Sequence, residues 1–182
     1  MEREPLAKQG TLVGRMIGAA RLDVTTYEEV EADTSLTVQA AIVVLIAAVA
    51  RGIGGAEAGA GAILGGLVGA LVAWCVWAGV TYLIGDKVLG GTATWGELLR
   101  TLGYAQAPGV LMILGIIRPL SGIIEAIVGI WLLIAGIVAI RQALDFGTGK
   151  AILTAFLGWL AGLIVMVLLG ISLGGLAALL AG

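Results

Sequence analysis

Residues 120–140 decide the fold of this chain, and they read LSGIIEAIVGIWLLIAGIVAI. At a rise of 1.5 Å per residue a helix of this length is roughly 30 Å long, which matches the hydrocarbon core of a bilayer. Glu125 is the one charged side chain in the run, so the helix has no polar face for water. The stretch is therefore predicted to cross a membrane.

The composition of the whole chain leads to the same class. Hydrophobic residues make up 60% and charged residues 12%, with a mean hydropathy of +1.10, whereas soluble domains carry roughly a quarter charged residues. Half of the charged residues lie within residues 1–35. The remainder has too few charges to cover a soluble fold, and an all-α, polytopic transmembrane helical bundle is predicted.

Five membrane spans are predicted, at residues 36–53, 61–84, 102–117, 120–140 and 151–175. They form a membrane domain over residues 36–182, which follows an N-terminal arm of residues 1–35. The third span is short and contains Pro108–Gly109, so it is expected to be bent, and a re-entrant segment stays an alternative. The last run is long enough to overshoot the bilayer, and it is expected to tilt or to break near Gly170.

The arm contains a candidate amphipathic helix. Its apolar residues recur at helical spacing: Leu12, Val13, Met16, Ile17 and Ala20. Arg15 and Arg21 fall elsewhere on the helical wheel, which is typical of a helix that lies in a membrane interface. The alternative is a short solvated helix.

Lysine and arginine predict the orientation. With five spans and a cytoplasmic N-terminus, only Arg51 and Arg118 of the ten basic residues lie outside. This asymmetry favours a cytoplasmic N-terminus and an external C-terminus.

The residue types exclude several functions. The chain has no histidine and one cysteine, Cys75, and no acidic residues at metal-ligand spacing, so no metal, no cofactor and no catalytic residue is predicted. The net charge is -2 with an acidic cluster at residues 28–33, which makes nucleic acid an improbable partner. A non-enzymatic protein is expected.

Glycines follow two regular patterns in the predicted spans. One set is Gly61, Gly65 and Gly69, and the other is Gly122, Gly129 and Gly136. Small residues at such spacing let helix backbones approach closely in a membrane. The stripes are predicted to pack helices, either within one protomer or in a seam between copies or with another membrane protein.

Glu125 is the one acidic residue well inside a predicted span, and Arg118 lies two turns earlier. An ionisable residue at this depth is a candidate for proton or ion movement, and Pro108 could expose backbone groups to a cavity. The structural alternative is that Glu125 pairs locally near the outer interface. Trp131 and Trp159 are predicted to pack between the fourth and fifth spans.

Three stretches resemble a known family. They are Trp95–Arg100 followed by GYAQAP at 103–108, the segment 22–33, and residues 131–145. Together they resemble the Yip-domain (Ypt/Rab-interacting) family of membrane proteins, in its prokaryotic branch. The resemblance implies five spans, a cytoplasmic N-terminus and a prokaryotic plasma membrane, and it makes Tyr104, Arg141 and Asp145 candidate functional residues. The Rab-linked role does not transfer, because the Asp-Leu-Tyr-Gly-Pro motif of eukaryotic members is missing.

Three functions therefore stay open. The first is a membrane-organising or interaction role with the lipid bilayer as partner, alone or as a homo-oligomer. The second is a small transporter or channel that uses Glu125, Arg118 and the helix interrupted at Pro108. The third is an accessory subunit of a larger membrane complex.

Overall fold

The structure is a computed structural model that describes the backbone of residues 10–55 and 60–181, and the side chains of residues 10–55, 64–165, 167 and 168. Within these ranges every regular element is a helix, as the composition predicts. Four of the helices are long and apolar enough to cross a membrane, and they cover Thr34–Gly55, Leu64–Val88, Arg118–Ala143 and Thr148–Val165.

Two short helices precede the bundle. Helix α1 spans Leu12–Ala20, with Thr11 as its N-cap, and α2 spans Val24–Ala32, with Asp23 as its N-cap. Leu22 between them has a positive φ of 63°, which reverses the chain so that α2 packs on α1. A 3-10 turn, η1 (Thr34–Leu36), then leads into the first long helix.

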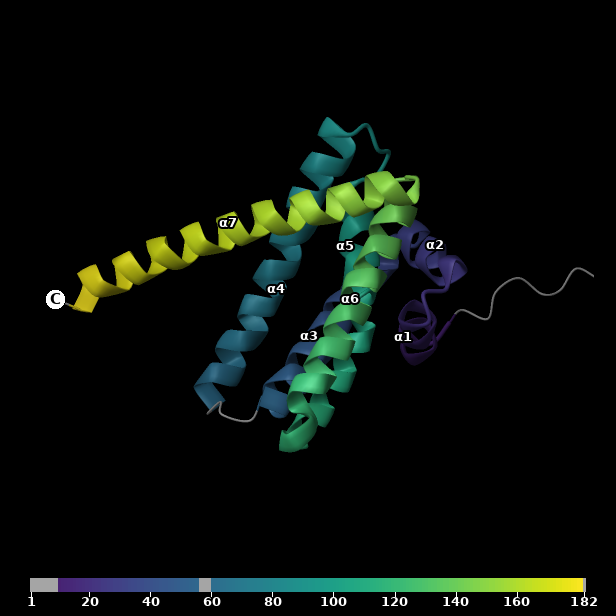
Figure 1. Ribbon diagram of the computed structural model, residues 1–182. Helices are drawn as coiled ribbons and strands as arrows, with labels where there is room; N and C mark the ends of the chain where they lie inside the picture. Colours follow the sequence, from purple (N-terminus) through teal and green to yellow (C-terminus); the bar gives the residue numbers. More distant parts are fainter. Residues whose placement is uncertain (1–9, 56–59, 182) are drawn as a thin grey trace, which may run out of the picture.

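The long helices form a bundle with one helix crossing it (Figure 1). Helices α3 (Thr37–Gly55), α4 (Ala60–Tyr82) and α6 (Ser121–Ala143) run along the bundle. Helix α7 (Thr148–Ala181) crosses over α4, and its C-terminal part projects away from the other helices. It continues as a helix through Gly170, so the expected break is absent. A π-helix, η2 (Leu83–Val88), extends α4.

The third predicted span is divided into two helices of different type. Helix α5 (Trp95–Tyr104) begins with a capping box between Thr94 and Glu97, and a 3-10 helix, η3 (Ala107–Ile116), follows with Pro108 in its first turn. A further 3-10 turn, η4 (Arg118–Leu120), leads into α6. The segment is interrupted as predicted, and it is not among the four candidate spans, so a count of five spans stays a prediction.

Small residues bring α3 close to α5 and η3. A Cβ atom added at Gly54 would lie 1.9 Å from the carbonyl oxygen of Met112, and one added at Gly103 would lie 2.8 Å from the Cβ of Ala40. At Gly109 the nearest atom would be the Cβ of Ala47, at 3.1 Å. We call the facing residues the small-residue seam; they are Ala40, Ala47 and Gly54 on α3, and Gly103, Gly109 and Gly115 opposite.

The tightest core lies at one end of the bundle. Six of the largest fully buried side chains come from α2, α5 and the end of α6: Tyr27, Leu98, Leu102, Tyr104, Ile140 and Leu144. Along α6 the exposed large apolar side chains run from Ile123 to Ile134, and Ala135, Ala139 and Ile140 are fully buried. One half of α6 therefore presents an apolar surface suited to lipid, while α2, α5 and α7 enclose the other half.

Candidate functional site

Helix α1 is attached to the bundle by a buried arginine as well as by apolar side chains. Arg15 is 7% exposed, and its guanidinium lies 2.8 Å from the Glu29 carboxylate of α2. It also donates to the Gln39 side-chain oxygen at 3.3 Å, and that oxygen accepts from the Tyr104 hydroxyl at 3.0 Å. The apolar side chains of Val13 and Ile17 are 62% and 48% exposed. Helix α1 thus buries Arg15 together with Ala19, packs Leu12, Met16 and Ala20 against the core, and leaves Val13 and Ile17 exposed.

The end of α1 is held by two further hydrogen bonds. The Trp131 indole nitrogen of α6 donates to the carbonyl oxygen of Ala20 at 2.7 Å, and the Tyr27 hydroxyl donates to that of Ala19 at 3.1 Å. The prediction that Trp131 packs toward the fifth span is wrong in this respect, because its indole reaches α1. Trp131 lies next to Leu133 and Ile134, where the exposed apolar surface of α6 ends. Helix α1 therefore lies level with that boundary.

A buried arginine joins α2 to α5. Arg100 is 4% exposed, and its guanidinium donates to the carbonyl oxygen of Val30 at 2.9 Å and to that of Glu31. Burial raises the pKa of the Glu31 carboxyl to about 7, and nearby carboxylates, Glu97 foremost, add to the rise. The end of the bundle formed by α2, α5 and the end of α6 therefore contains a carboxyl group with a pKa near neutral pH.

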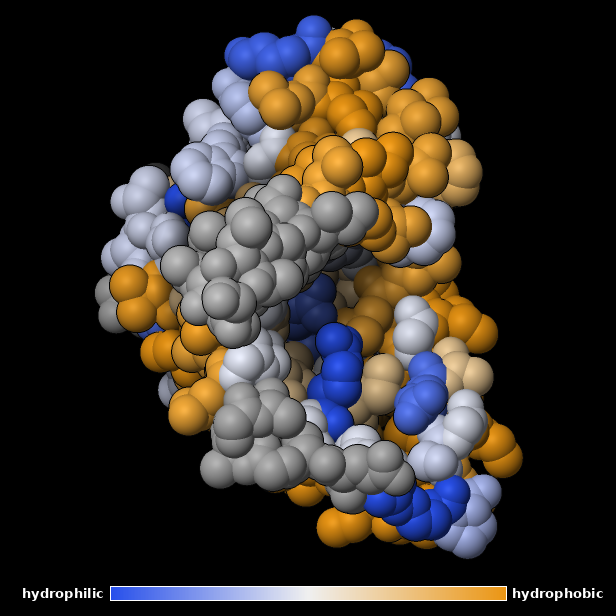
Figure 2. Space-filling model, turned by 90° about the vertical axis from the view of Figure 1, so that its left-hand side faces the viewer, coloured by the Kyte–Doolittle hydropathy of each residue, from blue (hydrophilic) through white to orange (hydrophobic). Residues whose placement is uncertain are grey.

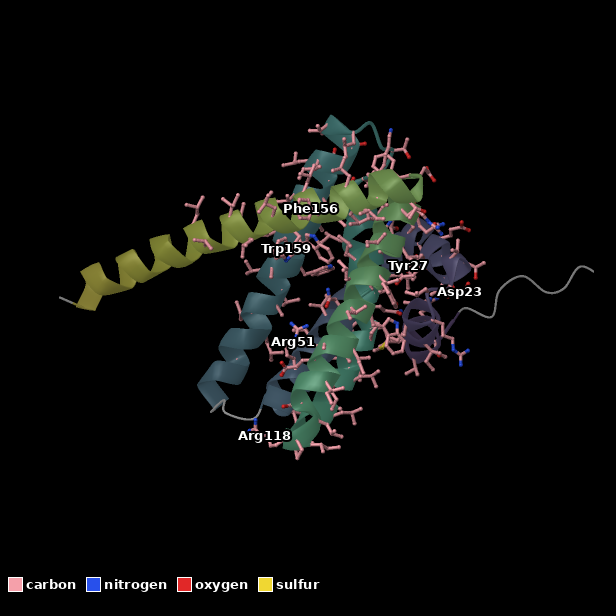
Figure 3. The ribbon with its side chains drawn as sticks, in the orientation of Figure 1. Asp23, Tyr27, Arg51, Arg118, Phe156 and Trp159 are labelled. Atoms are coloured by element: carbon pink, nitrogen blue, oxygen red, sulfur yellow. The ribbon has the colours of Figure 1, made fainter. Side chains whose placement is uncertain are left out.

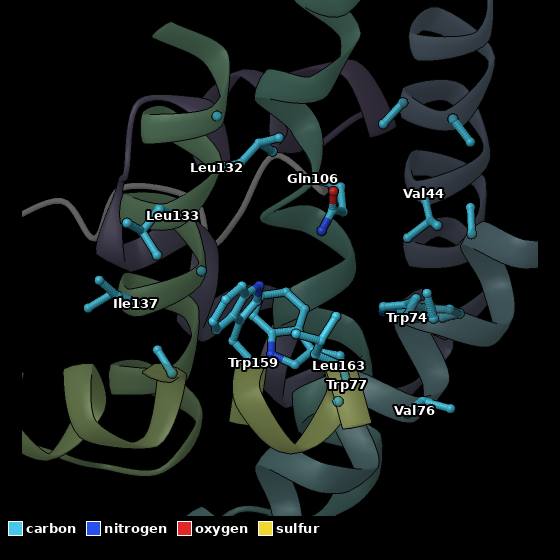
Figure 4. Close-up of a pocket in the computed structure, with 18 of the residues that line it drawn as sticks. Val44, Trp74, Val76, Trp77, Gln106, Leu132, Leu133, Ile137, Trp159 and Leu163 are labelled. Atoms are coloured by element: carbon cyan, nitrogen blue, oxygen red, sulfur yellow. The ribbon is translucent and has the colours of Figure 1, made fainter. Parts of the chain in front are cut away.

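A cavity of about 910 Å³ lies between α3, α4, α6 and α7. Figure 2 shows a hollow on this face of the molecule, with hydrophilic atoms inside and hydrophobic atoms along its flank. Most of the lining is apolar, and its largest side chains come from α4, α6 and α7: Trp74, Trp77, Leu132, Ile137, Phe156 and Trp159. Figure 4 shows the Trp77 and Trp159 rings close together, with Gln106 above them. The volume lies within the range of about 300–1,000 Å³ that is usual for ligand sites.

Three polar groups belong to the lining of this cavity. Arg51 of α3 and Gln106 are lining residues, and Figure 3 places Arg51 in the space between α4 and α6, with Phe156 and Trp159 on α7 above it. The Trp77 indole nitrogen is buried without a hydrogen-bond partner among the described residues. Within the same ranges no carboxylate forms an ion pair with Arg51. The cavity is thus apolar with a basic group at one end.

The predicted transport residues lie outside this cavity. Glu125 is exposed in the second turn of α6, and Arg118 is exposed in η4, near the lower end of the bundle in Figure 3. Neither lines the cavity. Pro108 is fully buried at the start of η3, where it begins a helical segment rather than opening one to water.

The family resemblance suggested Tyr104, Arg141 and Asp145 as functional residues. They lie at the end of the bundle where α2, α5 and α7 enclose α6, which we call the enclosed end. Tyr104 is buried and bonds to Gln39, while the Arg141 guanidinium donates to the Gln142 side chain at 3.0 Å. Asp145 has a positive φ of 52°, and its carboxylate accepts from the Thr92 hydroxyl at 2.8 Å. The Thr92–Asp145 hydrogen bond joins the α4–α5 loop to the turn between α6 and α7, and the Tyr104–Gln39 bond joins α5 to α3. A role for the three residues beyond these contacts stays a prediction.

The predicted glycine stripes lie mostly on open faces. A Cβ added at Gly65, Gly69, Gly122 or Gly129 would have no described heavy atom within 4 Å, other than the immediate chain and helix neighbours. At Gly136 it would lie 3.0 Å from the Trp77 ring. Gly61 belongs to α4 but lies outside the residues whose surroundings are described. Helix packing through these two stripes stays a prediction, and the small-residue seam was not predicted.

The described residues contain no group of three or more Cys, Asp or Glu side chains that could hold a metal ion.

In comparisons with known proteins, the chain matches the Yip1 domain over residues 24–169. The chain belongs to the Yip1 domain family. No curated protein and no solved structure matches it.

Membership of the Yip1 family confirms the predicted resemblance. The matched segment begins with α2 and extends into α7, so it contains the cavity and the small-residue seam. Helix α1 precedes the matched segment. With its apolar helices, this Yip1 protein fits a non-enzymatic role in a membrane. A prokaryotic origin stays a prediction.

Proposed function

We propose that this Yip1 protein organises the membrane around it, and that α1 does this by lying in the cytoplasmic interface. The single observation that carries the proposal is the outer face of α1, where Val13 and Ile17 are exposed while Arg15 is buried against the protein. Exposed apolar side chains are stabilised by burial in the boundary between headgroups and acyl chains. The helix then occupies area in one leaflet only.

The depth of α1 supports this placement. Its end is bonded to Trp131, which lies in the middle of α6, about 18 Å from Ala143 at 1.5 Å per residue. From Ala135 onward α6 is enclosed by other helices, and from Ile123 to Ile134 it has exposed large apolar side chains. The end of α1 therefore reaches about the middle of the span of α6, where its exposed side chains meet lipid and not water.

The cytoplasmic side follows from the charge asymmetry predicted above. The arm and the enclosed end contain most of the basic residues, among them Arg15, Arg100 and Arg141, and basic residues are retained on the cytoplasmic side. The external side then carries Arg51 and Arg118.

Vesicle remodelling tests the proposal. The purified protein is reconstituted at increasing protein-to-lipid ratio into liposomes of phosphatidylethanolamine and phosphatidylglycerol, and vesicle diameters are measured by electron cryomicroscopy. The wild-type protein is expected to lower the mean diameter with increasing ratio, and Val13→Ser/Ile17→Ser is expected to abolish this effect.

The control is Ile123→Ser/Ile127→Ser, which makes the same chemical change on the exposed face of α6. It is expected to remodel vesicles as the wild type does. Equal remodelling by the α1 variant and the wild type, or no remodelling by either, contradicts the proposal.

Transport and accessory-subunit roles have less support. Transport was linked to Glu125 and Arg118, and both are exposed residues outside the cavity. The exposed apolar faces that an accessory subunit would use are equally explained by lipid contact.

A further inference from the structure

We infer that the cavity between α3, α4, α6 and α7 binds one anionic phospholipid of the surrounding bilayer, with an acyl chain inside the cavity and the phosphate at Arg51. This site is separate from α1, and the inference does not rest on the proposed function. Three features support it: the charge of Arg51, the apolar walls of the cavity and its access from the bilayer.

Arg51 calls for an anionic partner. It lies one turn before the end of α3 and lines the cavity, and no described side chain neutralises it. Its side chain is exposed, so its guanidinium is accessible to a ligand in the cavity. A guanidinium binds phosphate oxygens through two parallel hydrogen bonds, so a lipid phosphate is a suitable partner for Arg51.

The walls of the cavity suit an acyl chain. Trp77, Ile137, Phe156 and Trp159 are large apolar side chains of the lining. Phe156 and Trp159 lie on α7, away from Arg51 (Figure 3). Gly129 in the same lining has no described heavy atom within 4 Å of an added Cβ, which leaves room along α6. An apolar space with a cation at one end is complementary to an anionic amphiphile.

Access from the bilayer favours a membrane lipid over a soluble ligand. The exposed apolar side chains beside the cavity include Val72 on α4, and Ile130 and Leu133 on α6, so its rim is continuous with surfaces suited to lipid. Lipid is also the solvent of these surfaces and is present in large excess.

Lipid retention measured by native mass spectrometry tests the inference. The protein is equilibrated in nanodiscs with equal amounts of phosphatidylglycerol and phosphatidylcholine of the same acyl chains, then released and its bound lipids are counted. The wild type is expected to retain one lipid, with a preference for phosphatidylglycerol of about tenfold, because the choline cation of phosphatidylcholine already neutralises its phosphate. Arg51→Gln is expected to remove the preference.

Arg118→Gln is the matched control, because Arg118 is an exposed arginine outside the cavity, and it is expected to keep the preference. Arg51→Lys keeps the charge without the planar fork and is expected to show a reduced preference. Gly129→Leu, which projects into open space, is expected to fold and to lose the retained lipid of both classes. Retention unchanged in Gly129→Leu, or a preference that survives Arg51→Gln, overturns the inference.

Discussion

The small-residue seam predicts opposite effects for two alanine substitutions that lie two residues apart on α3. A Cβ at position 54 would lie 1.9 Å from the carbonyl oxygen and 3.0 Å from the carbonyl carbon of Met112. Both are backbone atoms, which cannot rotate away as a side chain does. Gly54→Ala therefore forces α3 and η3 apart. At Gly52 an added Cβ meets nothing within 4 Å.

The two effects differ in sign and have calculable sizes. Alanine in place of glycine inside a helix gains roughly 0.5–1 kcal/mol from backbone propensity, and Gly52→Ala should show this gain alone. Overpacking a close contact costs about 1–3 kcal/mol. In Gly54→Ala that cost exceeds the gain, and the separation of the helices also loosens the contact between Ala47 and Gly109.

Reversible unfolding in mixed detergent micelles measures the free energy of unfolding of the wild type and of both variants. Gly52→Ala is expected to be more stable than the wild type. The 1.9 Å clash with backbone at Gly54 puts the overpacking cost in the upper part of its range, at about 2–3 kcal/mol, so Gly54→Ala is expected to be less stable by about 1–2.5 kcal/mol after the propensity gain is subtracted. If both alanine variants are stabilised to the same extent, α3 does not pack against η3 through Gly54, and the seam is refuted.

Three further predictions concern the arm, the enclosed end and the topology. The pKa of Glu31 rises from 4.5 to about 7 on folding, so the folded state binds the extra proton and stability falls as pH rises from about 4.5 to about 7. Glu31→Gln should remove this dependence and, because the carboxyl is only half-buried and screened, add about 1 kcal/mol at pH 8 and nothing at pH 4 in detergent unfolding; an unchanged pH profile contradicts it. Trp131→Phe removes the donor to Ala20 and should increase hydrogen exchange in α1 while that in α5 stays unchanged; uniform exchange changes would show that the bond does not hold the arm. With Cys75 replaced by alanine, Val88→Cys should react with a membrane-impermeant thiol reagent from the side of the N-terminus, and labelling from the opposite side would exclude the predicted orientation.

The membrane character of the fold could be predicted from the sequence because it depends on composition. A run such as residues 120–140 leaves no alternative to burial in lipid or protein, and α6 covers it. The interruption at Pro108 was also predictable from the chemistry of proline. The change to a 3-10 helix was not, since it depends on the contact with α3.

The packing glycines show why the contacts between helices cannot be predicted from the sequence of each helix alone. The predicted stripes repeat regularly within one helix, but the observed seam combines a seven-residue repeat at Ala40, Ala47 and Gly54 with a six-residue repeat at Gly109 and Gly115. Seven residues make two turns of an α-helix and six make two turns of a 3-10 helix. The two repeats match only once the helix types are known.

The candidate site was predictable in part. The spacing of apolar residues in α1 indicated an amphipathic helix, and the structure adds that Arg15 is directed inward by Glu29 and Gln39, which are distant in sequence. In the sequence, Arg51 served only to predict the orientation in the membrane. Its position in a cavity depends on α6 and α7 as well as on α3. Glu125 was selected because it lies inside a predicted span. Whether it faces the bundle or its outside depends on which face of α6 packs against the other helices.

The position of α1 relative to the bilayer is the central claim, and spin-label depth measurement tests it most directly. Nitroxide labels are attached at position 13 or 17 on α1, or at Thr25 on α2 as the reference, with Cys75 replaced by alanine. Their accessibility to oxygen and to a water-soluble nickel chelate is compared in liposomes. The account predicts that labels at 13 and 17 favour oxygen, and that the label at 25 favours nickel. Equal accessibility of all three labels to nickel would contradict it.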